Sequence, residues 1–510
     1  MISNSTCLSY AHRRPSTRPR TKDAFRTKRT VLRVHRTLQR AFLSVALCGS
    51  ALSSVCTALS DGHQSWFQAA VNLPDAVTYP YLRAATSYKI AMSPDAGTGD
   101  IDLQIQAAQR RIRAATEPQV LLEKLGWLYV AKARASYDQG FYKLAEQCAL
   151  ALEVPDPKSS AARLLRGHVL NSLHHFAEAE AIARELVHER VMPFDYGLLG
   201  DAVMEQGRLA EAIDAYQRMV DLRPDLQSYS RVAYVRWLKG DLDGAIEIAQ
   251  LTAGATSPLD PESASWALTR LGTYYFQAGS LADAKAACDA ALSYSSDYPA
   301  ALLLQSRFLL ANERPAEAIA SAQRAAEIDP LPEFQWTLAD TLRSAGHRDD
   351  AEKVEAVLRD GGAQEDPRTL ALFLATRGEQ TELAIELAQR EFQSRADIFT
   401  HDAFAWALTA AGRLEEAGPH MEKALAEGTI DARLFLHAGV LEAKLGHATS
   451  AEFYLNKARG LERMLLPSEQ QHLLAALDAL STRRDFKTLS AREDRLAKTS
   501  PTEQRKDRTE

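Results

Sequence analysis

The feature that most constrains this chain is an alanine that returns about every 34 residues along its body. Ten such anchor alanines follow one another in steps of 33 or 34 residues, with a single step of 39. They are Ala145, Ala179, Ala212, Ala245, Ala284, Ala318, Ala351, Ala384, Ala417 and Ala451. A period of this length predicts many copies of one small structural unit rather than a single compact core.

Each unit has the pattern of two short helices. Around each anchor alanine, apolar residues recur at i, i+3, i+4 and i+7 and break at a turn that often contains glycine, such as Gly207 or Gly240. A second small residue stands twelve positions before most anchors, as Gly200 does before Ala212. Small side chains allow two helix axes to approach to about 8 to 10 Å. Because a short helix pair cannot bury both of its apolar faces alone, we expect the pairs to stack.

The segment 196–224 (YGLLGDAVMEQGRLAEAIDAYQRMVDLRP) carries the most complete copy of the pattern. Gly200, Gly207, Ala212 and Pro224 stand in it at offsets that resemble the tetratricopeptide repeat. The resemblance covers about three quarters of the chain. It implies an all-α fold: a right-handed superhelix, or solenoid, of about ten antiparallel helix pairs closed by a C-terminal capping helix.

The chain departs from this pattern in three places. Glu313 stands where a turn glycine is expected, and the 39-residue step inserts a loop over 256–262. The early position of Leu125 relative to Ala145 predicts a first helix lengthened through 127–137. Near the other end, 402–412 looks like the final repeats of exported bacterial tetratricopeptide repeat proteins without an assigned activity.

The sequence divides into five expected regions. A basic segment with a signal peptide or membrane anchor occupies 1–58, and a linker follows over 59–95. The repeat superhelix is expected over 96–466 and the capping helix over 467–481. The charged region 482–510 contains few apolar residues, so we expect it to be disordered.

The N-terminal segment has the features of an export signal. Residues 1–60 hold eleven Lys and Arg against one acidic residue, and a charge-free run rich in small residues follows over 41–58. We expect cleavage near 51–53 or 56–58, and therefore a periplasmic or secreted protein. The unusual length of the basic part suggests that translation begins downstream, near Val34.

Other interpretations of this segment remain open. The run 41–58 is marginal as a membrane span, but it is compatible with an uncleaved anchor. The Arg- and Ser-rich, acid-poor start is also compatible with an organelle transit peptide. A lipoprotein anchor at Cys56 is less favoured, because Val55 precedes it where a small residue is expected.

Composition narrows the possible functions of the body. The whole chain has a net charge of -6, and since its N-terminal end is basic the remainder is strongly acidic. A nucleic-acid binder needs a basic face to neutralise phosphates, so no nucleic-acid partner is expected. Cys148 and Cys288 stand alone in the body, without the paired spacing of a zinc site, and their alanine-rich surroundings favour burial as small apolar residues.

Known catalytic motifs are absent from the sequence. There is no G-x-x-x-x-G-K-[ST], G-x-G-x-x-G, G-x-S-x-G or H-E-x-x-H pattern. His188 and Glu189 begin such a metal-binding pattern, but Pro193 follows where no second ligand is found. His174 and His175 stand at an expected turn, where polar side chains are common. We therefore expect no enzyme activity, no cofactor and no metal.

Binding is the better-supported activity. The resemblance implies a concave wall lined by the first helix of each pair, which holds a partner peptide or helix. Register with the repeat places these residues on that wall: Asp201, Met204, Tyr234, Trp237, Thr273, Phe276, Arg307, Asp340, Arg343, Trp406 and Thr409. Aromatic and arginine side chains are frequent energetic anchors of interfaces, although the aromatic residues here equally suit packing between helices.

We expect a non-catalytic scaffold that binds a protein or peptide in the cell envelope. The family's clamp for chaperone tails is disfavoured, because Asp201 and Tyr234 occupy two of its key positions. Two alternatives remain. In the first alternative the chain is an accessory or regulatory subunit held at a membrane through 41–58. In the second it is an envelope enzyme with an unrecognised site.

Overall fold

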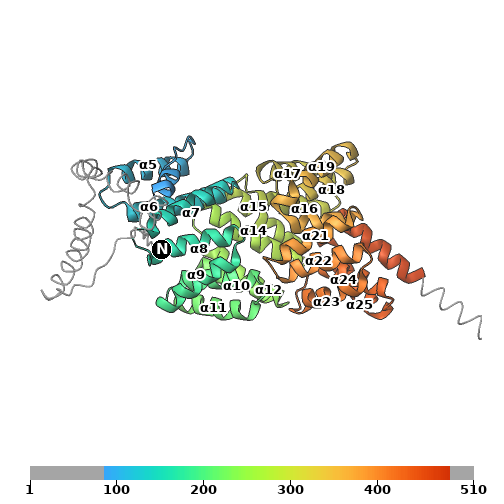
Figure 1. Cartoon of the computed structure of the whole chain (residues 1–510). Coiled ribbons are helices and arrows are strands. Elements are labelled where there is room, and N and C mark those ends of the chain that lie inside the picture. Colours follow the sequence, from blue (N-terminus) through green and yellow to red (C-terminus); the bar gives the residue numbers. More distant parts are fainter. Residues whose placement is uncertain (1–84, 155, 483–510) are drawn as a thin grey trace, which may run out of the picture. The chain divides into compact units, whose positions relative to one another are not determined.

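The structure is a computed structural model that describes residues 85–154 and 156–482. All regular elements within these ranges are helices (Figure 1). The helices with assigned bounds are α5 (Asp100–Ala114), α6 (Gln119–Ser136), α7 (Gly140–Glu153), α8 (Ser160–Ser172), α9 (Phe176–Glu189), α10 (Pro193–Glu205), α11 (Leu209–Leu222), α12 (Leu226–Leu238), α13 (Leu242–Gly254), α14 (Pro261–Gln277), α15 (Leu281–Tyr294), α16 (Pro299–Ala311), α17 (Pro315–Ile328), α18 (Pro332–Ser344), α19 (Arg348–Glu365), α20 (Pro367–Arg377), α21 (Thr381–Phe392), α22 (Ile398–Ala410), α23 (Leu414–Leu425), α24 (Ala432–Leu445), α25 (Ala448–Gly460) and the 3₁₀ turn η2 (Glu462–Met464).

Several expectations about the ends of the chain lie outside the described residues. These are the signal or anchor segment 1–58, most of the linker 59–95 and nearly all of the charged tail 482–510. Ala91 and Met92 are buried against Ile105, so the packed array begins before position 96. At the other end, residues 467–482 are helical. None of the helices in the described part of the chain combines the length and the apolar character needed to cross a membrane.

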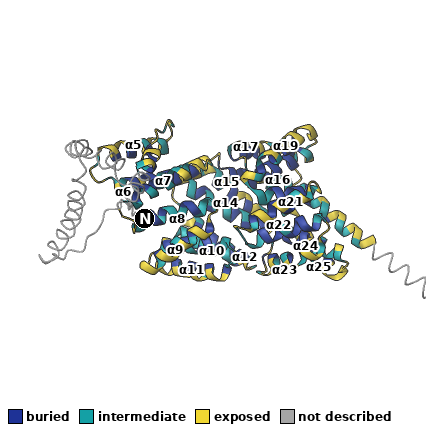
Figure 2. Ribbon diagram, viewed as in Figure 1, coloured by how far each residue is buried: buried dark blue, intermediate teal, exposed yellow. Residues whose placement is uncertain are grey.

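Successive helices pack as pairs, and each pair contacts the next. From α6/α7 to α24/α25 the described residues hold ten such pairs, which confirms the expected all-α solenoid of helix pairs. In most pairs the first helix holds more buried residues than the second, most clearly in the late repeats. Figure 2 shows this for α22, whose residues are mostly buried, in contrast to the exposed second helices α11 and α25.

The anchor alanines explain the period. All ten are buried on the second helix of their pair, with at most 1% of the residue exposed. Opposite them stand the small residues of the first helix. A Cβ atom added at Gly200 would overlap the ring of Tyr216, and one added at Gly439 would lie 2.6 Å from Cγ of Leu455. The repeated small residues therefore set the distance between the two helices of a pair.

The departures from the repeat also have structural counterparts. Helix α6 has 18 residues and ends at Ser136, with Tyr137 as its C-cap, which confirms the lengthened first helix. The 39-residue step is shared between a loop and a longer helix, because α14 has 17 residues. Glu313 adopts the left-handed conformation, with φ of 58°, in which other repeats place a turn glycine.

The solenoid also contacts itself at pairs that are five or six repeats apart. The backbone N–H of Ala396, before α22, donates to the carbonyl oxygen of Glu205, which ends α10, at 2.9 Å. Lys239, after α12, forms an ion pair with Glu427, after α23, at 2.7 Å. The hydroxyl of Thr429 donates to the carbonyl oxygen of Leu238 at 2.5 Å.

Turn glycines permit this approach. Gly207 and Gly240 both adopt φ of 78°, which L side chains rarely tolerate. A Cβ atom at Gly207 would also overlap the carbonyl oxygen of Ala396, and one at Gly240 would lie 2.5 Å from that of Gly428. Both the turn and the contact between distant repeats therefore require glycine at these two positions.

Candidate functional site

Three cavities lie along the first helices of the pairs. The early cavity, about 580 Å³, lies among α8, α10, α12 and α14. The middle cavity, about 430 Å³, is lined from α12 through α24 and by residues 464–469. The junction cavity, about 190 Å³, lies where α10 and α12 meet the loops around α22. Each is a preformed hollow on the side of the pairs where the sequence predicts binding.

Seven of the eleven predicted binding residues line these cavities. They are Asp201, Met204, Tyr234, Trp237, Thr273, Phe276 and Arg307. Tyr234 lines all three cavities and is half-buried. Trp237 is 7% exposed, and its ring stacks on Phe399 with 5.6 Å between the ring centroids. It therefore both packs between helices and forms cavity wall.

The other four predicted residues line none of the three cavities. Asp340, Trp406 and Thr409 are buried, and Arg343 pairs with Glu355 at 2.8 Å. The indole N–H of Trp406 donates to the hydroxyl of Thr376 at 3.0 Å. In the structure these four side chains are buried in, or paired within, the late repeats.

Two of these four residues, Asp340 and Trp406, are contacted by a covering segment, residues 461–482, which lies against the first helices of the late repeats. The backbone N–H and the hydroxyl of Ser468 donate to Oδ2 of Asp340 at 2.9 and 2.6 Å. The Nε2 atom of His472 lies 2.6 Å from the carbonyl oxygen of Thr376, and its ring contacts that of Trp406. The late repeats thus present their first helices to the chain's own C-terminal part.

Arginine and carboxylate side chains alternate along the cavity walls. Arg231 pairs with Asp201 at 2.5 Å, and Arg307 lies 3.8 Å from Glu333. Arg433 pairs with Glu469 of the covering segment. Burial acts to raise the pKa of Glu469, but the Arg433 guanidinium and its hydrogen bond outweigh burial and hold this pKa below its ordinary value.

Sequence reasoning missed most of these cavity arginines, but a usable signal exists. Arg231 and Arg270 stand three residues before the predicted residues Tyr234 and Thr273, that is, one turn earlier on the same helix face. Arg433 and Arg368 do not share this spacing and could be located only in the structure.

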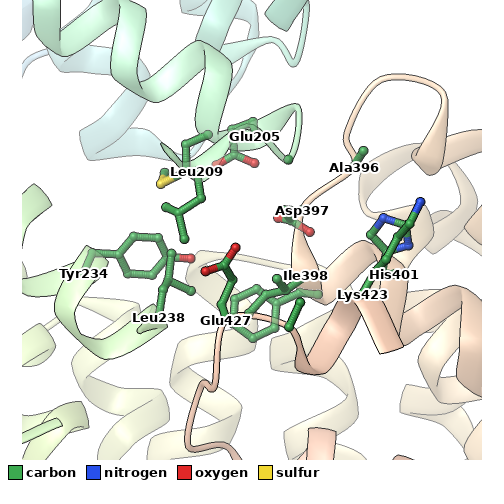
Figure 3. A pocket seen from close by; sticks show the side chains of 14 residues that line it. Glu205, Leu209, Tyr234, Leu238, Ala396, Asp397, Ile398, His401, Lys423 and Glu427 are labelled. Atoms are coloured by element: carbon green, nitrogen blue, oxygen red, sulfur yellow. The ribbon is translucent and has the colours of Figure 1, made fainter. Parts of the chain in front are cut away.

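The junction cavity joins early and late repeats (Figure 3). In the figure, Glu205, Leu209, Tyr234 and Leu238 project from the early repeats, and Asp397, Ile398 and Glu427 face them from the late ones. Arg395 pairs with Glu205 at 2.7 Å. Burial nevertheless raises the pKa of Glu205, aided by the neighbouring charge of Asp397 and opposed by Arg395.

The remaining titratable groups indicate buried packing. Cys148 and Cys288 are free and buried, and burial raises the pKa of the Cys288 thiol to about 12. The ring of His437 is buried, stacks on Trp406 and lies 2.9 Å from a carboxylate oxygen of Asp402. Among the described residues, no group of three His, Cys, Asp or Glu side chains is arranged to hold a metal ion.

Comparison with known proteins identifies the repeat. Residues 198–261 and 269–331 match the family model described as "Tetratricopeptide repeat". No curated protein matches the chain. The match to the family model spans α10 to α17, which carry most of the early cavity and part of the middle one.

Three solved structures are similar to this chain. A human IFIT1 dimer with PPP-AAAA is 13% identical over 74% of this chain and 94% of that one, with a TM-score of 0.42. A tetratricopeptide repeat protein from Parabacteroides merdae is 17% identical over 49% of this chain and 98% of that one, at 0.29. A chain of the APC/C hetero-tetramer Cut9-Hcn1 is 12% identical over 81% and 98%, at 0.33.

Proposed function

The chain is a tetratricopeptide repeat protein, and we propose that it is a non-catalytic scaffold that binds a segment of a partner protein along the first helices of its early repeats. The observation that carries this proposal is the placement of seven predicted residues around preformed cavities on α10, α12, α14 and α16. A preformed wall limits the ordering entropy that binding would otherwise lose.

The chemistry of the wall supports a peptide ligand. Tyr234, Trp237 and Phe276 provide flat apolar surface, and Asp201 and Arg307 provide polar groups among them. Interfaces commonly combine aromatic anchors with arginine in this way. The covering segment supports the same use of the fold, because a non-repeat stretch of polypeptide already lies against the first helices of the late repeats.

Partner capture from the native cells tests the proposal. The tagged full-length chain should retain a specific protein, and Tyr234→Ala should lose it because Tyr234 lines all three cavities. The matched control is Phe453→Ala, which removes an aromatic ring that is 53% exposed on α25, far along the chain from the cavities. Thermal unfolding of both variants checks their folding.

Loss of the partner in both variants, or in neither while both remain folded, would contradict binding at the cavities. A turnover assay on the purified chain addresses the enzyme alternative, since the proposal expects no reaction.

We also propose that the protein is exported to the cell envelope. This rests on the basic start and the charge-free run 41–58, which together have the pattern of an export signal. Mass spectrometry of the native protein should find a new N-terminus near 51–53 or 56–58. A full-length chain in the membrane fraction would favour the anchored accessory subunit instead.

A further inference from the structure

Arg270 differs from every other arginine that lines the cavities. Its neighbours each have a carboxylate: Arg231 has Asp201, Arg307 has Glu333, and Arg433 has Glu469. Arg134 and Arg368, also in these walls, pair with Glu262 and Asp397. Within the described residues, Arg270 is the one Lys or Arg that is not solvent-exposed and yet forms no ion pair with an acidic side chain.

The guanidinium of Arg270 is held by aromatic rings. It donates a hydrogen bond to the hydroxyl of Tyr274 at 3.2 Å and lies 5.3 Å from the centroid of that ring. It also lies 5.5 Å from the centroid of the Tyr234 ring. These contacts orient the group but use few of its five N–H donors. A permanently charged, half-buried guanidinium with unused donors is a ready site for an anion.

The position of Arg270 makes it accessible to a ligand in either large cavity. It lines both the early and the middle cavity, and Tyr234 lines both as well. Trp266 and Tyr274 add apolar surface on the early side, and Trp237 does so on the middle side. A peptide that placed an anionic group on Arg270 would therefore meet aromatic faces with the residues on either side of that group.

The chain itself shows which anion suits a cavity arginine. Glu469 belongs to the covering segment rather than to a repeat, and it places its carboxylate on Arg433 of α24. Arg433 is thus satisfied by a carboxylate that a separate stretch of polypeptide brings to the wall. Planar guanidinium and carboxylate groups match in shape and can form two parallel hydrogen bonds.

The charge of the surroundings favours a single negative charge. The other cavity arginines are already neutralised by the acids named above, and Glu205 adds a further carboxylate to the wall of the early cavity. A phosphate group carries close to two negative charges and would meet these carboxylates with one free cation to offset it. A carboxylate carries one charge, which matches one unpaired guanidinium.

We propose that Arg270 binds a single carboxylate of the partner peptide, from an Asp or Glu side chain or from the peptide's C-terminus, with apolar residues beside it against Tyr234, Tyr274 and Trp266. The inference rests on the proposed function and specifies the ligand chemistry of that site.

A displayed random-peptide library tests the inference, because it offers many side-chain chemistries to the cavities at once. The full chain should enrich peptides with Asp or Glu at one position flanked by apolar residues, at least about tenfold over the naive library. Arg270→Gln should lose the acidic preference, and Arg270→Lys should keep part of it, because lysine retains the charge but not the planar fork. The matched control is Arg324→Gln, which removes an exposed, ion-paired arginine on α17 and should leave the preference unchanged.

The selected peptide then separates the possible outcomes. Replacing its Glu or Asp by Gln or Asn should raise the Kd at least about tenfold for the natural chain and leave it nearly unchanged for Arg270→Gln. If amidating the C-terminus of the peptide raises the Kd instead, the carboxylate that Arg270 binds is the terminal one. Preference for a phosphorylated over a carboxylate peptide overturns the inference, as does an Arg270→Gln variant that is folded and keeps the acidic preference.

A pool from the natural chain without acidic enrichment, including one that retains nothing, also overturns it. Enrichment of neutral peptides whose binding is lost in Tyr234→Ala would overturn the role of Arg270 while leaving the scaffold function in place.

Discussion

Asp201 and Asp340 occupy the same position of the repeat, eleven residues before an anchor alanine, yet their surroundings differ. Asp201 is half-buried and pairs with Arg231 on the wall of the early cavity. Asp340 is 1% exposed and accepts two hydrogen bonds from Ser468. Two aspartates at the same position of the repeat thus have different surroundings. One lies on a cavity wall in the early half of the array, and the other is buried in the late half.

The difference teaches that the covering segment, and not the repeat, decides which first helices remain accessible. Residues 461–482 lie against α18, α20, α22 and α24, and they reach α16 where Arg307 donates to the carbonyl oxygen of Met464 at 2.6 Å. The early cavity beside Arg270 on α14 is lined by residues between 134 and 274 and by none of the covering segment. Four experiments can break or refine this contrast between the two halves.

Removing the covering segment should have the largest effect. A chain ending at residue 460 loses the buried side chains of Leu465, Leu466 and Leu473, worth about 6 kcal/mol of stability in the late repeats at about 2 kcal/mol each. Hydrogen exchange should accelerate in α20 and α22 and stay nearly constant in α10 and α12. A chain ending at residue 482 is the control. Equal acceleration in both halves would show that the segment does not act locally.

Replacing each of the two equivalent aspartates by alanine should destabilise the late half of the array more than the early half. Asp340→Ala leaves the buried N–H and hydroxyl of Ser468 without their acceptor and should lower the free energy of unfolding by about 3 kcal/mol. Asp201→Ala breaks a partly exposed pair and should lower it by about 1 kcal/mol. Urea denaturation measures both, and a reversed order would contradict the proposed difference in packing.

Acidification should weaken both halves alike. Burial lowers the pKa of His168, on the early cavity, and of His401, in α22, to about 4. Because the unfolded imidazole titrates near 6.5, the unfolded chain binds more protons between these values, so stability falls as the pH drops from about 6.5 to 4. Each histidine should contribute about 1 to 3 kcal/mol. His168→Gln and His401→Gln should each flatten the pH profile, and an unchanged profile would show that the ring is not buried neutral.

Replacing two tryptophans by phenylalanine should give the smallest difference in stability. Trp406 donates its buried N–H to Thr376, whereas the N–H of Trp237 is buried without a hydrogen-bond partner. Trp406→Phe therefore loses a hydrogen bond, and Trp237→Phe removes an unsatisfied donor. The first should cost about 1 to 2 kcal/mol more than the second, measured by urea denaturation. An equal loss of stability in the two variants would indicate that both indole N–H groups have equivalent surroundings.

Much of the fold was predictable because its determinants are local. The spacing of anchor alanines such as Ala212 and of partners such as Gly200 fixes one helix pair and its contact with the next, wherever the pair stands in the chain. The same register placed Tyr234 and Arg307 correctly on the cavity walls. It could not show that Asp340 and Trp406 would be covered, because the residues that contact them, Ser468 and His472, stand far later in the sequence.

The sequence by itself determined the helix pair, its length and its stacking, since these depend on side chains within about one repeat of each other. Only the tertiary structure decided where the solenoid contacts itself, as at Glu205 and Ala396, and which arginine is left without a carboxylate. The contact between distant repeats depends on the small rotation from each pair to the next, accumulated over five or six pairs. The pairing of the arginines depends also on a C-terminal segment that folds back. The sequence pattern of a single repeat specifies neither of these.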